Sequence, residues 1–116
     1  MIDKIFAISD DVRYVAIYRK GQLESKSKGN TQGASSSESD RFEELLVNPT
    51  LIKAASQRGN IDCGGLDYLL IRYGNFFQFI LPVSWGHVSV CIEMRADPTF
   101  IGLKVISLIE NETYVA

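Results

Sequence analysis

The chain contains one histidine and two cysteines among 116 residues. Neither Cys63 nor Cys91 has a second type of metal ligand close to it in sequence, so the sequence offers no basis for a zinc site. The motifs of common catalytic sites are also missing, because there is no GxSxG, no GxGxxG and no Gly-rich loop that ends in Lys and Ser or Thr. These absences predict a protein that is not an enzyme and that carries neither a metal ion nor a cofactor.

Hydrophobic runs of membrane-spanning length are missing as well. The N-terminal segment MIDKIFAISDDV is interrupted by Asp3, Lys4 and Ser9 and contains no core of a signal peptide. No stretch approaches the roughly 20 apolar residues that a membrane-spanning helix needs. We therefore expect a cytoplasmic protein without membrane insertion, and cysteines that stay reduced.

The chain also has no excess of positive charge. Lys and Arg number 12 against 14 Asp and Glu, which gives a formal net charge of −2. Proteins that hold nucleic acid through its phosphates need basic charge to displace counterions. The sequence therefore argues against DNA or RNA as a partner.

The residues that are present suit one compact domain over residues 1–116. An apolar fraction of 46% lies near the average of globular proteins and is enough for a single core. Residues 29–40, GNTQGASSSESD, are rich in Gly and Ser and have nothing to bury, which predicts a flexible loop. This loop is long for a connection within a domain, and the sequence leaves its role open.

The N-terminal part of the chain predicts a helix followed by a hairpin. Ile2, Ile5 and Phe6 repeat at helical spacing and fall on one side of a short helix. The segment RYVAIYRKGQLESKSK then predicts two strands at residues 14–19 and 23–28, joined by a turn that contains Gly.

A second helix is predicted to begin near Arg41 and to continue to about Arg58. Asp40 followed by Glu43 is typical of a capping arrangement, in which side-chain oxygens accept from free amides at a helix start. Pro49 lacks an amide hydrogen and disfavours helical geometry at the preceding residue. We expect the helix to kink or restart at this proline.

Three strands follow and form a meander. They are expected at residues 66–73, 76–83 and 87–94. Gly74 and Asn75 suit a tight turn, and Trp85 and Gly86 lie at the next reversal. Apolar and polar residues alternate in the third of these strands, which predicts that one of its faces is the more buried.

Two polar residues of this strand call for separate interpretations. Cys91 is interpreted as a small core thiol. His87 lies beside a turn and has no evident partner that would orient it as a base, so it is interpreted as an exposed side chain. Beyond the strand, Asp97 and Pro98 suit the cap and first residue of a closing helix, whose broad apolar surface must pack on the sheet.

This order of elements resembles the roadblock and dynein-light-chain family. The similarity is carried by YVAIYRKGQLESKSK and by LDYLLIRYGNFFQFILPVSWGHVSVCIEMRADPTFIGLKVISLI, and so spans nearly the whole chain. It rests on the order and spacing of the elements and on the ADPTFIGL segment that begins the last helix. The Gly- and Ser-rich loop and Pro49 depart from the family pattern.

The resemblance implies an α+β fold, an α/β sandwich of roadblock-like (profilin-like) architecture. Its five-stranded antiparallel sheet has the order 2-1-5-4-3, with one helix on one face and two helices on the other. Strands that are covered on both faces are apolar on both, which explains the apolar run from Leu69 to Val83.

The resemblance also implies a homodimer in which the third strand and the second helix pair across a two-fold axis. An apolar strand left open at a sheet edge invites aggregation, and pairing removes that hazard. The interface residues that follow are Phe42, Leu46, Ile52, Tyr68, Leu70 and Arg72.

The function implied by the family is noncatalytic regulation or scaffolding of a small GTPase or of a motor or signalling complex. Two alternatives stay open. One is a small-ligand sensor of the PAS or GAF type, which needs a pocket between sheet and helix; Phe76, Phe77 and Phe79 are interpreted as filling such a space. The other is a purely structural subunit of a larger assembly.

Trp85 is the best single candidate for a partner contact. It lies at a predicted hairpin tip, and exposed aromatic residues often anchor interfaces. An equally weighted alternative is that Trp85 folds back and caps the core.

Overall fold

The computed structural model describes residues 1–29 and 37–115. Its five-stranded antiparallel sheet has the order β2-β1-β5-β4-β3, which confirms the expected topology. The elements are α1 (Ile2–Phe6), β1 (Val12–Arg19), β2 (Gln22–Ser27), α2 (Ser37–Phe42), the π-helical turn η1 (Glu43–Val47), α3 (Asn48–Asp62), β3 (Leu69–Arg72), β4 (Phe77–Val83), β5 (Gly86–Ile92) and α4 (Pro98–Val115).

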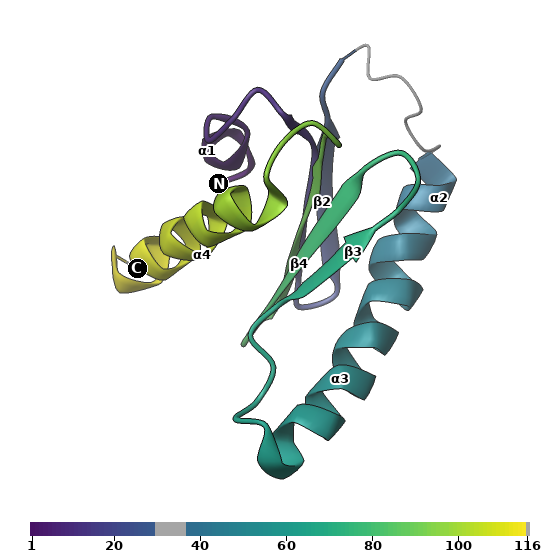
Figure 1. Cartoon of the computed structure of the whole chain (residues 1–116), viewed down its shortest axis with the longest axis vertical. Coiled ribbons are helices and arrows are strands. Elements are labelled where there is room, and N and C mark those ends of the chain that lie inside the picture. Colours follow the sequence, from purple (N-terminus) through teal and green to yellow (C-terminus); the bar gives the residue numbers. More distant parts are fainter. Residues whose placement is uncertain (30–36, 116) are drawn as a thin grey trace.

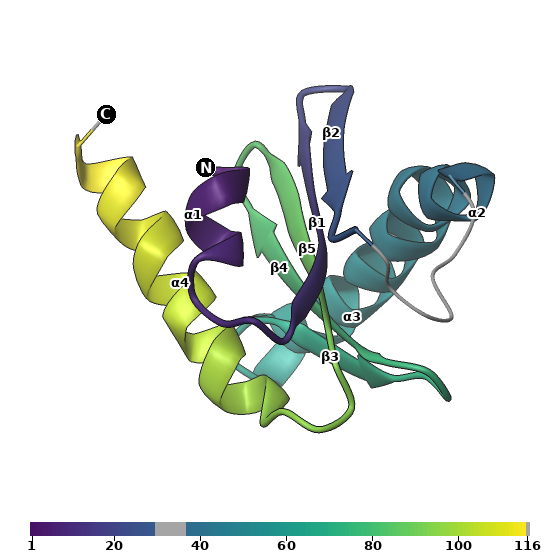
Figure 2. The ribbon, with the colours of Figure 1, turned by 90° about the horizontal axis from the view of Figure 1, so that it is seen from above.

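Helices cover both faces of the sheet. Figures 1 and 2 show α1 and α4 on one side and the α2–α3 segment on the other, as expected for an α/β sandwich. The larger core lies under α1 and α4, where paired residues such as Val15 and Val90 share a face. The buried members of this core are Ile5, Val12, Val15, Ile17, Phe79, Leu81, Val88, Val90, Ile92, Ile101, Val105 and Ile109.

The opposite face of the sheet, under the α2–α3 segment, is also buried but is more polar. A row across β1, β5 and β4 consists of Tyr14, Cys91 and Gln78, which are direct cross-strand partners. The interpretation of Cys91 as a buried thiol is confirmed. The expected difference between the two faces of β5 is wrong. The α2–α3 segment, residues 37–62, is called the helical segment below, and it covers the face that carries His87 and Cys91.

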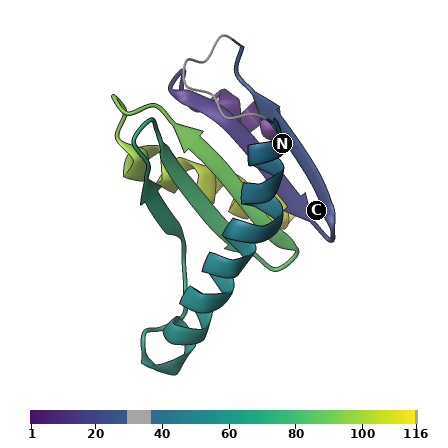
Figure 3. The same cartoon turned by 90° about the vertical axis from the view of Figure 1, so that its right-hand side faces the viewer.

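The second helix runs without a gap from residue 37 to residue 62 and crosses the sheet as one rod (Figure 3). Pro49 does not split it. Because a proline ring crowds the carbonyl four residues earlier, the helix widens just before it into η1, where the Asn48 amide donates to the Glu43 carbonyl five residues back. The expected interruption therefore takes the form of one wide turn.

Two predictions about the start of this helix need correction. Residues 30–36 of the expected loop 29–40 lie outside the described residues, whereas residues 37–40 belong to α2. The prediction therefore placed the end of the loop too late, because residues 37–40 are helical. Asp40 lies inside the helix and not at its N-cap, so the predicted capping role of Asp40 is wrong.

Strand β3 is shorter than expected, because residues 66–68 lie outside it and belong to the connection between α3 and the sheet. The C-terminal end of α3 extends beyond the strands, and residues 63–68 bring the chain back to the sheet (Figure 1). The tight turn at Gly74 and Asn75 is confirmed, since the Tyr73 amide donates to the Phe76 carbonyl at 2.9 Å.

The closing helix α4 begins as predicted. The Thr99 amide donates to Asp97 Oδ1 at 3.0 Å, so Asp97 caps the helix and Pro98 is its first residue. Among the described helices, none has both the length and the apolar character needed to cross a bilayer.

Candidate functional site

A buried polar cluster joins the helical segment to the sheet. Glu44 Oε2 lies 2.7 Å from His87 Nε2, and the two side chains are 0% and 2% exposed. Asn48 Nδ2 donates to the other carboxylate oxygen, Glu44 Oε1, at 3.1 Å. The Tyr18 ring stacks on the imidazole with ring centroids 5.4 Å apart. Both carboxylate oxygens of Glu44 therefore have a polar partner.

The prediction that His87 is exposed is wrong. The register of the sheet places His87 opposite Tyr18, on the face that the helical segment covers. A signal for its burial was present in the sequence, since His87 alternates with Val88 and so falls on the same face as Cys91. Its partner Glu44 lies 43 residues away and is not indicated by any local pattern.

A cavity of about 620 Å³ lies beside this cluster, between the start of the helical segment and the sheet. One wall is the sheet row of Tyr14, Cys91 and Gln78, a second is the β3–β4 turn, and the third is the inner side of α2 and η1. The lining residues are Tyr14, Glu38, Ser39, Asp40, Phe42, Glu43, Glu44, Tyr73, Gly74, Asn75, Phe76, Gln78 and Cys91.

Three phenylalanines in or just before β4 divide between this cavity and the core. Phe79 lies in the core under α4, and Phe77 packs against that core, as a filling role requires. Phe76 precedes the strand and lines the cavity, so its interpretation as filling is wrong. The period of two along a strand places neighbouring residues on opposite faces, which explains the division.

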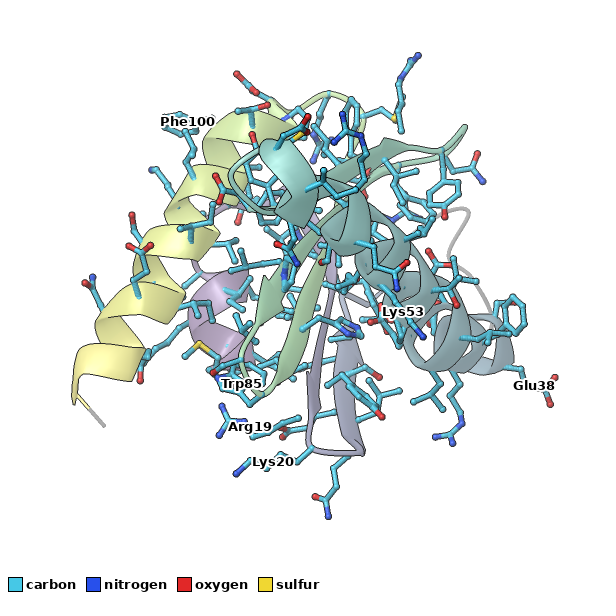
Figure 4. The ribbon with its side chains drawn as sticks, turned by 90° about the horizontal axis from the view of Figure 1, so that it is seen from below. Arg19, Lys20, Glu38, Lys53, Trp85 and Phe100 are labelled. Carbon is cyan, nitrogen blue, oxygen red and sulfur yellow. The ribbon has the colours of Figure 1, made fainter. Side chains whose placement is uncertain are left out.

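The cavity has a strongly acidic helical wall. Glu38, Asp40, Glu43 and Glu44 all line it, and none of the described lining residues is Lys, Arg or His. Figure 4 shows Glu38 projecting outward at the end of α2, which places it at the rim. Asp40 and Glu43 are half-buried and stand between this rim and the buried Glu44.

The negative charge of this wall is reflected in the pKa values around it. Burial, followed by the charges of Glu44 and Glu43, raises the pKa of Asp40 above its usual range. Burial also raises the pKa of Glu43, although a hydrogen bond from the Tyr73 hydroxyl at 3.0 Å opposes part of the rise. Burial and this acceptor raise the pKa of Tyr73 to about 12. The site therefore disfavours additional negative charge.

Two buried polar atoms at the cavity have no hydrogen-bond partner among the described residues. They are the Tyr14 hydroxyl and Gln78 Oε1, on side chains that are 8% and 1% exposed. Gln78 Nε2 donates to Ser89 Oγ at 2.8 Å, so the amide oxygen faces away from that bond. A buried polar atom without a partner costs about 1–3 kcal/mol, and both atoms belong to residues that line the cavity.

Arg13 lies behind the aromatic end of the cavity without lining it. Its guanidinium carbon is 5.1 Å from the centre of the Phe76 ring, and its Nη1 donates to the Asn75 carbonyl at 3.1 Å. The same group forms an ion pair with Glu93 at 3.6 Å. Phe76 thus has a cation on one side and the cavity beside it.

The raised carboxyl pKa values predict a specific pH effect on stability. A carboxyl group whose pKa is higher in the folded state contributes stability below its unfolded pKa, near 4, and this contribution is lost as pH rises through the folded pKa. Replacing Glu43 with Gln removes one such group and keeps an acceptor for Tyr73. We therefore expect E43Q to gain stability relative to wild type as pH rises.

The measurement is urea unfolding of wild type and E43Q at about pH 3 and about pH 7.5, on either side of the carboxyl titration. The control is E24Q, which changes an exposed residue of β2 outside the cavity. A stability difference between E43Q and wild type that is the same at both pH values would contradict the assignment.

Three of the predicted interface residues lie on the helical segment. Phe42 and Leu46 are 59% and 55% exposed. Ile52 is half-buried. Phe42 also lines the cavity, so the predicted interface and the cavity share this residue.

The other three predicted interface residues lie at β3, on the far side of the sheet. Leu70 pairs with Phe79 and therefore shares the face that α4 covers. The Tyr68 ring tilts against Phe79 with centroids 5.0 Å apart, while Arg72 is exposed. The structure thus places the six residues in two groups, one on each face of the sheet.

Trp85 combines features of both interpretations given to it. It is half-buried and packs against the core under α4. The Arg19 guanidinium lies 4.4 Å above its ring, and Figure 4 shows Arg19 and Lys20 beside it at the end of the β1–β2 hairpin. The residue therefore caps one end of the core beneath a basic pair.

Other chemistry is sparse in the part of the chain that the structure describes. No group of three His, Cys, Asp or Glu side chains there is arranged to hold a metal ion. Both cysteines are free, Cys63 at the surface and Cys91 in the interior. No protein-family model matches the chain, and no curated protein matches it either. The family resemblance therefore rests on the order and spacing of the sequence elements.

Proposed function

We propose that the chain is a noncatalytic homodimeric regulator or scaffold whose partner is a small GTPase or a similar switch protein. The observation that carries the dimer is an exposed apolar surface on the helical segment. Phe42, Leu45, Leu46 and Leu51 are each at least 37% exposed within less than three helical turns. Clusters of exposed apolar side chains are typical of protein interfaces.

The edge of the sheet supports the same proposal. In the described part of the chain β3 has β4 as its only neighbour, so its outer backbone groups are available for pairing. A second copy of β3 would continue the sheet across a two-fold axis. The end of α3 extends beyond the strands and carries Ile61, which is 76% exposed, where a neighbouring subunit would cover it.

Replacing Leu46 with Glu is expected to dissociate the dimer. A carboxylate buried in the interface without a partner costs several kcal/mol, which raises the dissociation constant at least about a hundredfold. Light scattering after gel filtration should give twice the monomer mass of 13.0 kDa for wild type and 13.0 kDa for L46E.

The control is L103E, which places the same charge at a residue of α4 with a similar exposure, 54% against 55%. It should remain a dimer, because α4 lies on the opposite side of the sheet (Figure 2). Circular dichroism should show both variants folded. A wild-type monomer at micromolar concentration, or equal dissociation of both variants, would contradict the proposed interface.

A partner that acts as a switch should bind in one nucleotide state more tightly than in the other. Only contacts that differ between the two states can transmit regulation. The test is titration of the dimer with small GTPases from the same organism, loaded with GDP or with a nonhydrolysable GTP analogue. Equal binding in both states would support a scaffold and contradict a regulator.

A second candidate function is the binding of a small ligand. It is favoured by the cavity between the sheet and the helical segment, which a sensor domain of the PAS or GAF type requires. Ligand binding and dimer formation use different residues of the helical segment apart from Phe42, so the two functions are compatible.

A further inference from the structure

We propose that this cavity binds a small organic cation, with an ammonium or guanidinium group on a short aliphatic stem. The inference rests on the second candidate function and is independent of the dimer. It assigns a chemical class to the ligand from the polar atoms, the charge and the rings that line the cavity.

The polar atoms of the cavity call for a ligand that donates hydrogen bonds. Gln78 Oε1 accepts only, has no partner in the described residues and lies on a side chain that is 1% exposed. Asp40 and Glu43 add carboxylate oxygens on the helical wall of the same cavity. A ligand that carries more than one N–H donor would satisfy the amide oxygen and a carboxylate.

The charge of the cavity decides which class of hydrogen-bond donor fits it. Burial raises the pKa of Asp40 and Glu43, and the neighbouring carboxylates raise it further, so a cation relieves a repulsion that an anion would increase. Phosphates and carboxylic acids are therefore poor ligands. A metal ion fits less well than an organic cation, because no three acidic side chains in the described ranges converge as metal coordination requires.

The aromatic wall suits the rest of such a ligand. Tyr14, Tyr73 and Phe76 also line the cavity, and aromatic faces attract cations and pack well against methylene groups. Phe76 already has the Arg13 guanidinium 5.1 Å from its centre. The volume of about 620 Å³ lies within the range of about 300–1,000 Å³ that is usual for small-ligand sites.

The test is calorimetric titration of the full chain with four probes. Cadaverine and agmatine represent free ammonium and guanidinium compounds, and lysine capped at both ends represents a side chain of another protein. Pentanol, with a similar stem and no charge, is the neutral control. Binding of cadaverine or agmatine without capped lysine points to a free metabolite, and the reverse points to a protein side chain.

The matched variants are the double substitution Asp40→Asn with Glu43→Gln, and E24Q as control. The double variant keeps the shape of the wall and removes two charges, so it should stay folded while its affinity for the cation falls at least about tenfold. E24Q should bind as wild type does.

Three outcomes would overturn the inference: no binding of any cationic probe, equal binding by the double variant, or equal binding of pentanol. Pentanol binding without cation binding would leave a ligand site in place and reject only its cationic class. Light scattering on the same samples reports the dimer separately. A monomer that binds a cation would reject the dimer and keep this site.

Discussion

Replacing His87 with Leu is expected to lower the free energy of unfolding by about 3–5 kcal/mol. Its partner Glu44 is 0% exposed and approaches His87 Nε2 at 2.7 Å. The substitution leaves a buried carboxylate that keeps only the hydrogen bond from Asn48 Nδ2. Urea unfolding at neutral pH measures the loss, which is a large part of the roughly 5–15 kcal/mol that stabilises an ordinary domain.

A double-mutant cycle tests whether the loss arises from the pair. Replacing both Glu44 and His87 with Leu removes both polar groups, and apolar replacement of a buried pair is often neutral. The double variant should therefore be clearly more stable than the sum of the two single effects predicts. Additive effects would show that the two side chains contribute independently and would contradict the assignment.

An exposed ion pair provides the matched comparison. Arg58 and Asp62 lie one turn apart on α3 at 2.5 Å, and both side chains are more than 60% exposed. Replacing Arg58 with Leu should change stability far less than replacing His87, because solvent screens the exposed pair. The contrast separates the effect of burial from the effect of charge.

The sequence predicted the order of the elements because that order depends on local patterns. The helical spacing of Ile2, Ile5 and Phe6 corresponds to α1, and Gly74 with Asn75 marks the β3–β4 turn. Turn residues and hydrophobic periods act over a few positions, so they are visible without the fold. The sheet order came from the family resemblance, and the structure agrees with it.

The polar interior was not predicted, because its contacts join distant parts of the chain. Glu44 and His87 are 43 residues apart, and Gln78 donates to Ser89 on the neighbouring strand. The cavity likewise requires α2 to lie over the β3–β4 turn, which no local pattern indicates. A polar residue beside a turn or near the start of a helix is usually exposed, so the sequence alone does not reveal that such a residue is buried here.

The effect of Pro49 was predicted in position but not in form. A missing amide and a crowded ring disturb a helix, but the sequence does not show whether the chain bends, breaks or widens. The structure widens it into η1, and Thr50 Oγ1 donates to the Leu46 carbonyl at 2.7 Å within the same stretch. This wide turn carries Glu43 and Glu44, so the departure from regular helix lies at the cavity wall.

Gly86 is the position where the smallest added side chain should do the most damage. It begins β5 with φ of +154°, a conformation that residues with a Cβ rarely adopt. A Cβ built there would lie 1.8 Å from the Tyr18 carbonyl oxygen, which belongs to the backbone of the neighbouring strand. The clash would separate β1 from β5 at the point where Tyr18 stacks on His87.

We therefore expect Gly86→Ala to lower the free energy of unfolding by at least about 3 kcal/mol, through backbone strain together with the clash. Gly21→Ala separates these causes, because Gly21 has φ of +84° and nothing within 4 Å of an added Cβ, and should cost about 1–2 kcal/mol. Gly74→Ala has open space and no such φ, so it should be neutral or stabilise the fold by about 0.5 kcal/mol. Urea unfolding of the three variants gives the order, and equal losses at Gly86 and Gly21 would show that the close approach to Tyr18 contributes nothing.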